Sequence, residues 1–221
     1  MNILAIDTTS DILNTALMYN DQIYENSADI GLKHSETLAP MVDRLFQFLG
    51  AEYSNLDCIA VAKGPGSFTA LRIGISFAKG IAFGASCPII SYNSLDLYAE
   101  LKSYFPGIVV PIIDARKKRV YTAMYKGNKK FSDYLDISLE ELLKKLETFS
   151  DSILFCGPHA SSADLFAENK NVYYIDNIRT GAARLLLEKA QNSYNEANYD
   201  NEQEGPLYIR KSEAELGAKN A

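Results

Sequence analysis

A glycine-rich turn between two apolar segments is the feature that most limits how this chain can fold. Residues 58–62 form a short apolar run typical of a buried strand, and the turn Gly-Pro-Gly-Ser follows at 64–67. A long helical pattern then starts at about Thr69. A strand, a glycine turn and a helix in succession direct backbone N–H groups and a helix dipole toward an anion. The spacing matches neither a Rossmann fingerprint nor a Walker A loop, so the turn indicates an α/β fold and leaves phosphate binding open.

The helix after the turn carries small residues on one face. Ala70, Gly74 and Ala78 recur every four residues, and Gly80 and Gly84 follow. Each interior helical glycine costs about 1 kcal/mol relative to alanine, which makes sense where another backbone approaches closely. The pattern permits two interpretations: an inner helix packed against its own sheet, or a surface for the helix of a partner.

Composition favours a soluble globular protein that does not bind RNA unaided. The 221 residues suffice for one large domain or two small ones, and the formal net charge of −6 disfavours the neutralisation of phosphates. No apolar run approaches the roughly 20 residues of a membrane span, and the first residues lack the basic region of a signal peptide. Cys58, Cys87 and Cys156 stand in apolar surroundings, so we expect buried, reduced thiols in a cytoplasmic protein.

The two halves of the chain open in the same way. Residues 3–7 read as a strand that ends at Asp7, and residues 108–113 read as a second strand that ends at Asp114. Each is followed by a turn and an alternating strand, and Pro-Gly at 106–107 separates the halves. The sequence therefore predicts a two-lobed α/β protein with lobes at 1–106 and 107–221. We expect the tail from about residue 205 to pack back on the first lobe.

A second amphipathic helix is predicted in the first half, with Ser35 as its N-cap. Its apolar face repeats with the helical period, and the residues that carry it include Leu38, Met41, Val42 and Leu45.

No catalytic constellation follows from the spacing of reactive residues. Ser67 lacks the flanking glycines of a nucleophile elbow. His34 and His159 are far apart in sequence and form no His-x-x-x-His pair, so a metal site is not expected. Asp7 and Asp114, one at each strand end, are the one acid pair that could meet across a cleft between the lobes.

Five segments together resemble the bacterial TsaB family, which is also called YeaZ. They are residues 3–10 (ILAIDTTS), 34–36 (HSE) with Leu38 and Pro40, 63–74 (KGPGSFTALRIG), 114–121 (DARKKRVY) and 206–215 (PLYIRKSEAE). The matches run in order along the whole chain, and the segment 63–74 is highly specific. One departure is Ala70, which occupies a position usually held by glycine.

The resemblance implies an actin-like ATPase fold with a ribonuclease-H-like core, as in the ASKHA superfamily, and a role in making threonylcarbamoyladenosine beside the anticodon of tRNAs. In that family the catalyst is a paralogous partner, TsaD, and TsaB is its non-catalytic companion, joined by the small ATPase TsaE. We expect the two helices that begin near Ser35 and Thr69 to form a homodimer when the partner is absent, because exposed apolar surface needs cover. The acidic charge disfavours direct binding of tRNA, so we expect contact with tRNA only through the complex. No cofactor of its own is expected, whereas ATP or ADP could bind at the partner complex.

Two sites are expected on this basis, and neither is catalytic or metal-binding. The partner interface is predicted on the helices that begin near Ser35 and Thr69, with residues His34, Ser35, Leu38, Met41, Val42, Leu45, Ala70, Leu71, Gly74 and Ala78. A vestigial nucleotide-binding site is predicted at the turns, with residues Asp7, Thr8, Thr9, Gly64, Gly66, Ser67 and Asp114.

Two other functions remain alternatives. An ATPase or small-molecule kinase would use Asp7, the turn at 64–67 and Asp114, and would bind Mg-ATP without a partner. A metallopeptidase is an old label for this superfamily and is the least favoured, because the sequence lacks the metal ligands.

Overall fold

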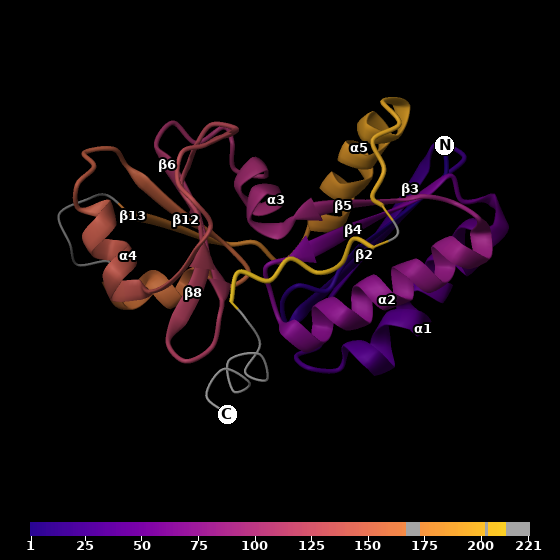
Figure 1. The fold of residues 1–221 in the computed structure, drawn as a ribbon, viewed down its shortest axis with the longest axis horizontal. Coiled ribbons are helices and arrows are strands. Elements are labelled where there is room, and N and C mark those ends of the chain that lie inside the picture. Colours follow the sequence, from indigo (N-terminus) through magenta and orange to yellow (C-terminus); the bar gives the residue numbers. More distant parts are fainter. Residues whose placement is uncertain (167–172, 202, 211–221) are drawn as a thin grey trace.

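The computed structural model describes residues 1–166, 173–201 and 203–210. Over these residues the protein is a mixed α/β structure with two five-stranded sheets and one three-stranded sheet. The two larger sheets lie toward opposite ends of the molecule, with helix α3 between them (Figure 1). The α/β class predicted from the sequence is therefore confirmed.

The first sheet joins a run of antiparallel strands to two parallel ones. Its order is β3 (Gln22–Asp29), β2 (Ile12–Tyr19), β1 (Ile3–Asp7), β4 (Cys58–Gly64) and β5 (Ile89–Asn93). Strand β1 pairs antiparallel with β2 and parallel with β4. Because β1 and β4 are parallel neighbours, the turns that follow them lie at the same edge of the sheet.

Helices cover both faces of the first sheet. Helices α1 (His34–Leu49) and α2 (Phe68–Ala85) lie side by side on one face, and α5 (Ala182–Asn195) lies on the other (Figure 1). Successive side chains of β1 alternate between them, so that Leu4 and Ile6 pack with α1 and α2 while Ile3 and Ala5 pack with α5. The division of the chain at residue 106 remains a prediction, and α5, from the second half of the sequence, covers the first sheet.

Helix α2 is apolar on more than its inner side. The inner side consists of the buried residues Ala70, Leu71, Gly74, Ile75, Ala78 and Ala82. Within the part of the chain that the structure describes, α2 is the one helix that matches a membrane span by length and composition. Helix α2 contacts β4, α1 and η1, and its Phe83 is an apolar residue that faces outward, since 91% of its surface is exposed.

The start of α1 differs from the expectation. Ser35 is not the N-cap, because Lys33 takes that position and makes no side-chain capping bond. The Lys33 carbonyl already accepts from the N–H groups of Glu36 (3.2 Å) and Thr37 (3.0 Å), so the helix begins one residue before Ser35. Ser35 lies inside the first turn and is exposed.

The second large sheet has the order β10 (Lys129–Lys130), β9 (Tyr125–Lys126), β6 (Ile108–Pro111), β12 (Ile153–Gly157) and β13 (Tyr173–Asn177). The small sheet has the order β11 (Leu135–Ser138), β8 (Arg119–Thr122) and β7 (Ile113–Asp114). Helix α4 (Leu139–Leu146) packs with β6 and β12, and α3 (Ser94–Glu100) packs between the two large sheets. The described part of the chain also contains two short 3₁₀ helices, η1 (Tyr53–Asn55) and η2 (Ala160–Phe166).

The described end of the chain, residues 203–210, contacts both halves of the molecule. The N–H of Leu207 donates to the carbonyl of Lys63 in β4 (2.7 Å), and the ring of Tyr208 lies 4.6 Å from that of Phe68 in α2. Arg210 donates to the Asp136 carboxylate of β11 through Nε (2.6 Å) and Nη2 (2.7 Å). Residues 211–215 of the PLYIRKSEAE segment lie outside the described residues.

Candidate functional site

The glycine turn after β4 is packed against the turn that follows β1. The Ser67 N–H donates to the Thr9 carbonyl (2.9 Å), and Thr8 Oγ1 donates to the Ala70 carbonyl (2.8 Å). A Cβ at Gly66 would collide with the Thr9 carbonyl. Glycine is therefore required at this position by the close approach of two turns of the same chain.

Asp7 is sealed beneath these turns. Its carboxylate is 1% exposed and accepts hydrogen bonds from Thr9 N–H (2.9 Å), Thr9 Oγ1 (2.7 Å) and the Tyr98 hydroxyl (2.9 Å). Burial raises the pKa of Asp7, while these hydrogen bonds oppose that rise. Burial and the neighbouring Asp7 charge raise the pKa of Tyr98 well above its ordinary value, so the phenol remains a donor. Donors from the protein itself thus occupy the carboxylate.

The residues predicted for a nucleotide site separate into two groups. Those that line a cleft of about 780 Å³ between the first sheet and the β7 turn are Thr9, Gly66, Ser67 and Asp114. The other three, Asp7, Thr8 and Gly64, do not line this cleft. The expected acid pair across the cleft is therefore not formed, because Asp7 lies behind the turn. Among the residues in the described ranges, no group of three or more His, Cys, Asp or Glu side chains is placed to hold a metal ion.

The residues predicted to meet a partner face inward, with the exception of Ser35. The buried ones are His34, Leu38, Met41, Val42, Leu45, Ala70, Leu71, Gly74 and Ala78. A Cβ at Gly74 would collide with the Thr8 side chain. The small-residue face of α2 thus accommodates the β1 turn of the same chain. The other buried side chains are enclosed in the core, apart from His34, which lines the cleft beside the β1 turn.

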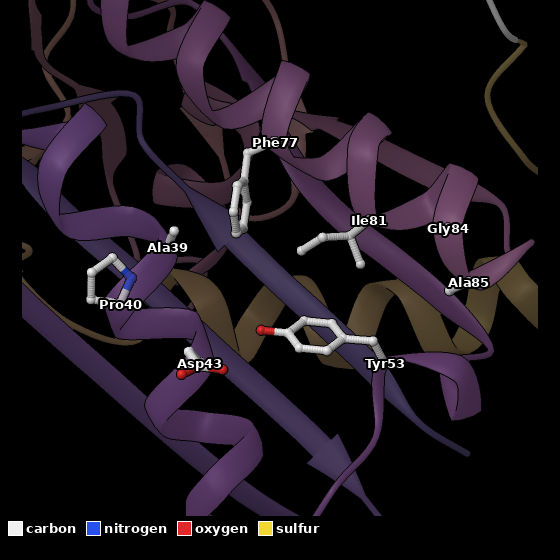
Figure 2. A pocket seen from close by; sticks show the side chains of 8 residues that line it. All are labelled: Ala39, Pro40, Asp43, Tyr53, Phe77, Ile81, Gly84 and Ala85. Carbon is white, nitrogen blue, oxygen red and sulfur yellow. The ribbon is translucent and has the colours of Figure 1, made fainter.

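The outward sides of α1 and α2 form an apolar groove of about 750 Å³ (Figure 2). Its lining residues are Ala39, Pro40 and Asp43 from α1, Tyr53 from η1, and Phe77, Ile81, Gly84 and Ala85 from α2. Figure 2 shows Phe77 and Ile81 reaching from α2 toward the Tyr53 ring. The α2 positions 77, 81, 84 and 85 follow the helical period, so this helix carries a second apolar stripe. The apolar residues of this stripe stand at helical spacing in the sequence, so the sequence contains a signal for the outward stripe as well as for the inner one.

Two polar groups lie in the groove. Tyr53 stacks on Phe46 with ring centroids 3.9 Å apart, and Asp43 Oδ2 accepts from Gln47 Nε2 (2.8 Å). Burial and the Asp43 charge raise the pKa of Tyr53. The phenol therefore stays protonated at neutral pH and can donate a hydrogen bond to a docked chain.

The glycines of the outward side are not explained by packing within the chain. A Cβ added at Gly80 or Gly84 would meet no atom within 4 Å. Each costs the helix about 1 kcal/mol relative to alanine. Gly84 lines the groove, so its small size widens a surface that the chain itself leaves uncovered.

Most of the chain is similar in sequence and in fold to one group of known proteins. The family model of TsaD, tRNA N6-adenosine threonylcarbamoyltransferase, matches residues 29–217. The tRNA threonylcarbamoyladenosine biosynthesis protein TsaB of Bacillus subtilis (strain 168) is 34% identical over 73% of this chain and 72% of its own length. The protein of the same name from Haemophilus influenzae is 29% identical over 79% and 71%. The solved structure of YeaZ from Pseudomonas aeruginosa has a TM-score of 0.78 at 24% identity, covering 94% of this chain and 99% of that one.

Proposed function

The chain belongs to the TsaB (YeaZ) family, and from that membership we propose that it is a scaffold subunit required for threonylcarbamoyladenosine modification of tRNA beside the anticodon. In this proposal the chain activates a catalytic partner, TsaD, and performs no chemistry itself. TsaE joins the complex as a third component.

We propose the two-lobed, actin-like ATPase fold with a ribonuclease-H-like core. The pairing of strands supports it, because β1 and β7 each end in an aspartate and each pairs antiparallel with the next strand, β2 and β8 respectively. The lobes would correspond to residues 1–106 and 107–221, with α5 and the described tail returning to the first.

The observation that carries the proposal is the outward groove between α1 and α2. Contiguous apolar surface on a soluble protein marks an interaction site more often than chance exposure. The groove presents aromatic and aliphatic side chains around a glycine, which suits the close approach of a helix. Because the TsaD family model matches this chain, a TsaD partner would present a similar helix pair. The same surface would join two copies of this chain when TsaD is absent.

The remaining parts of the proposal concern location and ligands. We place the protein in the cytoplasm. The net charge of −6 disfavours direct contact with tRNA, so tRNA would be reached through the complex. ATP or ADP would bind at the partner complex.

An ATPase or kinase is the second candidate, favoured by the cleft beside the glycine turn. Against it stand the three donors that occupy the Asp7 carboxylate, since a catalytic acid must be free to meet a metal or a substrate proton. Calorimetry with Mg-ATP separates the two. Micromolar binding by the isolated chain, lost in Asp7→Ala variants that still fold, would favour the enzyme.

Reconstitution of tRNA modification tests the scaffold directly. Purified TsaD and TsaE are assayed on unmodified tRNA with and without this chain. We expect modification only when the chain is present, and no modification or ATP turnover by the chain alone. Modification that proceeds equally well without the chain would contradict the proposal.

A further inference from the structure

The described tail, residues 203–210, crosses from the first sheet toward β8 of the small sheet (Figure 1). It runs along the cleft of about 780 Å³ that separates the starts of α1 and α2 from the β7 turn, and residues 207–210 line this cleft. A segment in this position touches both walls of the cleft. Its contacts therefore bear on how far the two walls stand apart.

The backbone of the tail is bound to the glycine turn. The Leu207 N–H donates to the Lys63 carbonyl at the end of β4 (2.7 Å). The Lys63 ammonium donates to the Glu204 carboxylate (2.9 Å). The packing is close, because a Cβ added at Gly64 would lie 3.0 Å from the Leu207 carbonyl oxygen. The tail is thus held against the turn that precedes α2.

The next residue of the tail is bound to α2 itself. The Tyr208 ring lies 4.6 Å from the ring of Phe68, and its hydroxyl accepts from Arg72 Nε (3.1 Å). The Arg72 guanidinium carbon lies 3.9 Å from the centre of the Phe68 ring, a cation–π contact. We call the contacts of Leu207 and Tyr208 the first anchor of the tail.

Arg210 binds the small sheet at the other wall of the cleft. Its Nε and Nη2 donate to the two carboxylate oxygens of Asp136 in β11 (2.6 and 2.7 Å), and its Nη1 donates to the Ala115 carbonyl (3.1 Å). Two parallel bonds from one guanidinium fix the geometry as well as the charge pairing. The Asp136 side chain is 15% exposed, so solvent screens the pair only weakly. We call these contacts the second anchor.

The Asp136 carboxylate is charged at neutral pH. Burial opposes its ionisation, but the hydrogen bonds from Arg210 and Arg119 lower its pKa below the ordinary value. An arginine keeps its charge at any pH near neutrality. The second anchor is therefore a permanent ion pair under these conditions.

The two anchors are close together along the chain. Three residues lead from Leu207 to Arg210, and three extended residues span at most roughly 11 Å. Ile209, between the anchors, packs against the apolar cluster that contains Tyr98 and Val109. The walls of the cleft cannot separate beyond the reach of this segment while both anchors hold.

The other contacts of the small sheet lie mainly within the second half of the chain. Strand β8 contacts β6, and β11 contacts α4. Helix α3, in contrast, contacts β4 and β5 of the first sheet as well as β6 and β12 of the second. The two large sheets are thus joined through α3, and the tail joins the small sheet to the start of α2.

Two ion pairs elsewhere between the halves are weaker. Arg179 Nη1 lies 2.6 Å from Asp29 Oδ2, but both side chains are more than half exposed, so water and salt screen the pair. His159 Nε2 lies 3.4 Å from Asp11 Oδ1. Burial lowers the pKa of His159, so this contact lacks a cation at neutral pH. The pair of Arg210 with Asp136 is both charged and shielded.

We propose that the tail is a latch that sets the width of the cleft, with Leu207 and Tyr208 binding it to α2 and the glycine turn and Arg210 binding it to the small sheet. With both anchors made, the small sheet is held beside the start of α2. With either anchor broken, the small sheet moves away from α2, while α3 keeps the two large sheets together. The latch depends on contacts within this chain and not on the proposed function in tRNA modification.

Double electron–electron resonance between two spin labels tests the latch in the full chain. The labels are placed at Glu36→Cys in α1 and Lys118→Cys in the β7 turn, two exposed positions on opposite sides of the cleft. Cys87 is replaced by serine, and the other two cysteines are fully buried. We expect a narrow distance distribution with the native tail, and a broader one at longer distance for Arg210→Gln. An unchanged distribution in a folded Arg210→Gln variant would overturn the proposal.

Arg179→Gln is the matched control. It removes the same kind of side chain from an ion pair that also joins the two halves, but this pair is exposed. We expect the native distance distribution. Lengthening equal to that of Arg210→Gln would overturn the proposal, because any ion pair between the halves would then set the width.

Tyr208→Ala tests whether the two anchors act as one device. It weakens the first anchor and leaves the contacts of Asp136 intact, so it decides the question if Arg210→Gln does not fold. We expect longer distances in Tyr208→Ala. We expect the double variant to match Arg210→Gln alone, because a segment released at one end no longer restrains the sheet. Native distances in a folded Tyr208→Ala variant, or further lengthening in the double variant, would overturn the proposal.

Discussion

The two ends of helix α2 both contain glycine, for different reasons. Near the N-terminus, Gly74 leaves room for the Thr8 side chain, which would collide with any Cβ at that position. Near the C-terminus, Gly84 faces open space within the chain and lines the outward groove. The sequence shows the same residue type at helical spacing in both places. A small residue therefore indicates a close approach without indicating whether the approaching group belongs to the same chain.

The sharpest contrast between the two ends is in stability. Gly74→Ala should destabilise the fold by about 3 kcal/mol, because the added Cβ overpacks a closed core against Thr8. Urea unfolding of Gly74→Ala and of the matched variant Gly84→Ala measures the difference. We call the part of α2 around Gly74 the closed end, because Thr8 of the same chain covers it, and the part around Gly84 the open end. Equal effects of the two substitutions would contradict this distinction.

The buried carboxylate of Asp7 lies behind the β1 turn, at the closed end of α2. Tyr98→Phe removes the hydroxyl that donates to Asp7 Oδ2 (2.9 Å). Leaving that buried oxygen without its donor should cost about 1–3 kcal/mol, measured by urea unfolding. Tyr134→Phe is a suitable control, because its hydroxyl donates to a half-buried carboxylate, that of Asp96. A smaller loss in Tyr98→Phe than in Tyr134→Phe would contradict the account.

The closed end should also give stability a defined pH dependence. Burial lowers the pKa of His34 below its ordinary 6.5, so the unfolded chain takes up a proton before the folded one. The contribution of His34 to the free energy of unfolding is complete above about pH 6.5 and is lost as the pH falls through the lowered pKa of the folded chain. Asp7 acts oppositely, because its raised pKa favours proton uptake by the folded chain at acid pH. The unfolding free energy should fall between pH 7.5 and about 5.5, with a smaller slope in His34→Gln; an unchanged slope would oppose this assignment.

The smallest expected effect is at the open end. Gly84→Ala should stabilise the fold by up to about 1 kcal/mol, since alanine is a better helix former and meets no neighbouring atom. Thermal unfolding in the absence of any partner checks this. A loss of stability would show that the C-terminal end of α2 is constrained in a way that its open surroundings do not explain.

The sequence was sufficient for most of the elements and for the family. Strand, turn and helix around residue 64 were predicted from the apolar run and the glycines, and the structure has β4 followed directly by α2. The inner side of α1 was also predicted correctly as an apolar stripe, since Leu38, Met41, Val42 and Leu45 are all buried. Local pattern and periodicity determine these features.

The direction in which each stripe faces could not be predicted. The small-residue face of α2 meets the turn after β1, a contact between Gly74 and Thr8 that depends on the tertiary arrangement. The same holds for Asp7, whose position at a strand end resembles that of a catalytic acid until Tyr98 from α3 is seen to cap it. Long-range contacts of this kind leave no local spacing in the sequence.

We propose that the outward groove, and not the small-residue face, receives the partner. Gly84→Arg places a long side chain in the groove while keeping a good helix former, and Ser76→Arg places the same side chain on an exposed α2 position that does not line the groove. Calorimetry of each variant with purified TsaD measures the affinity. We expect at least a hundredfold loss of affinity for Gly84→Arg, about 2.7 kcal/mol, with unchanged folding. We expect near wild-type binding for Ser76→Arg. Wild-type affinity of a folded Gly84→Arg variant would contradict it.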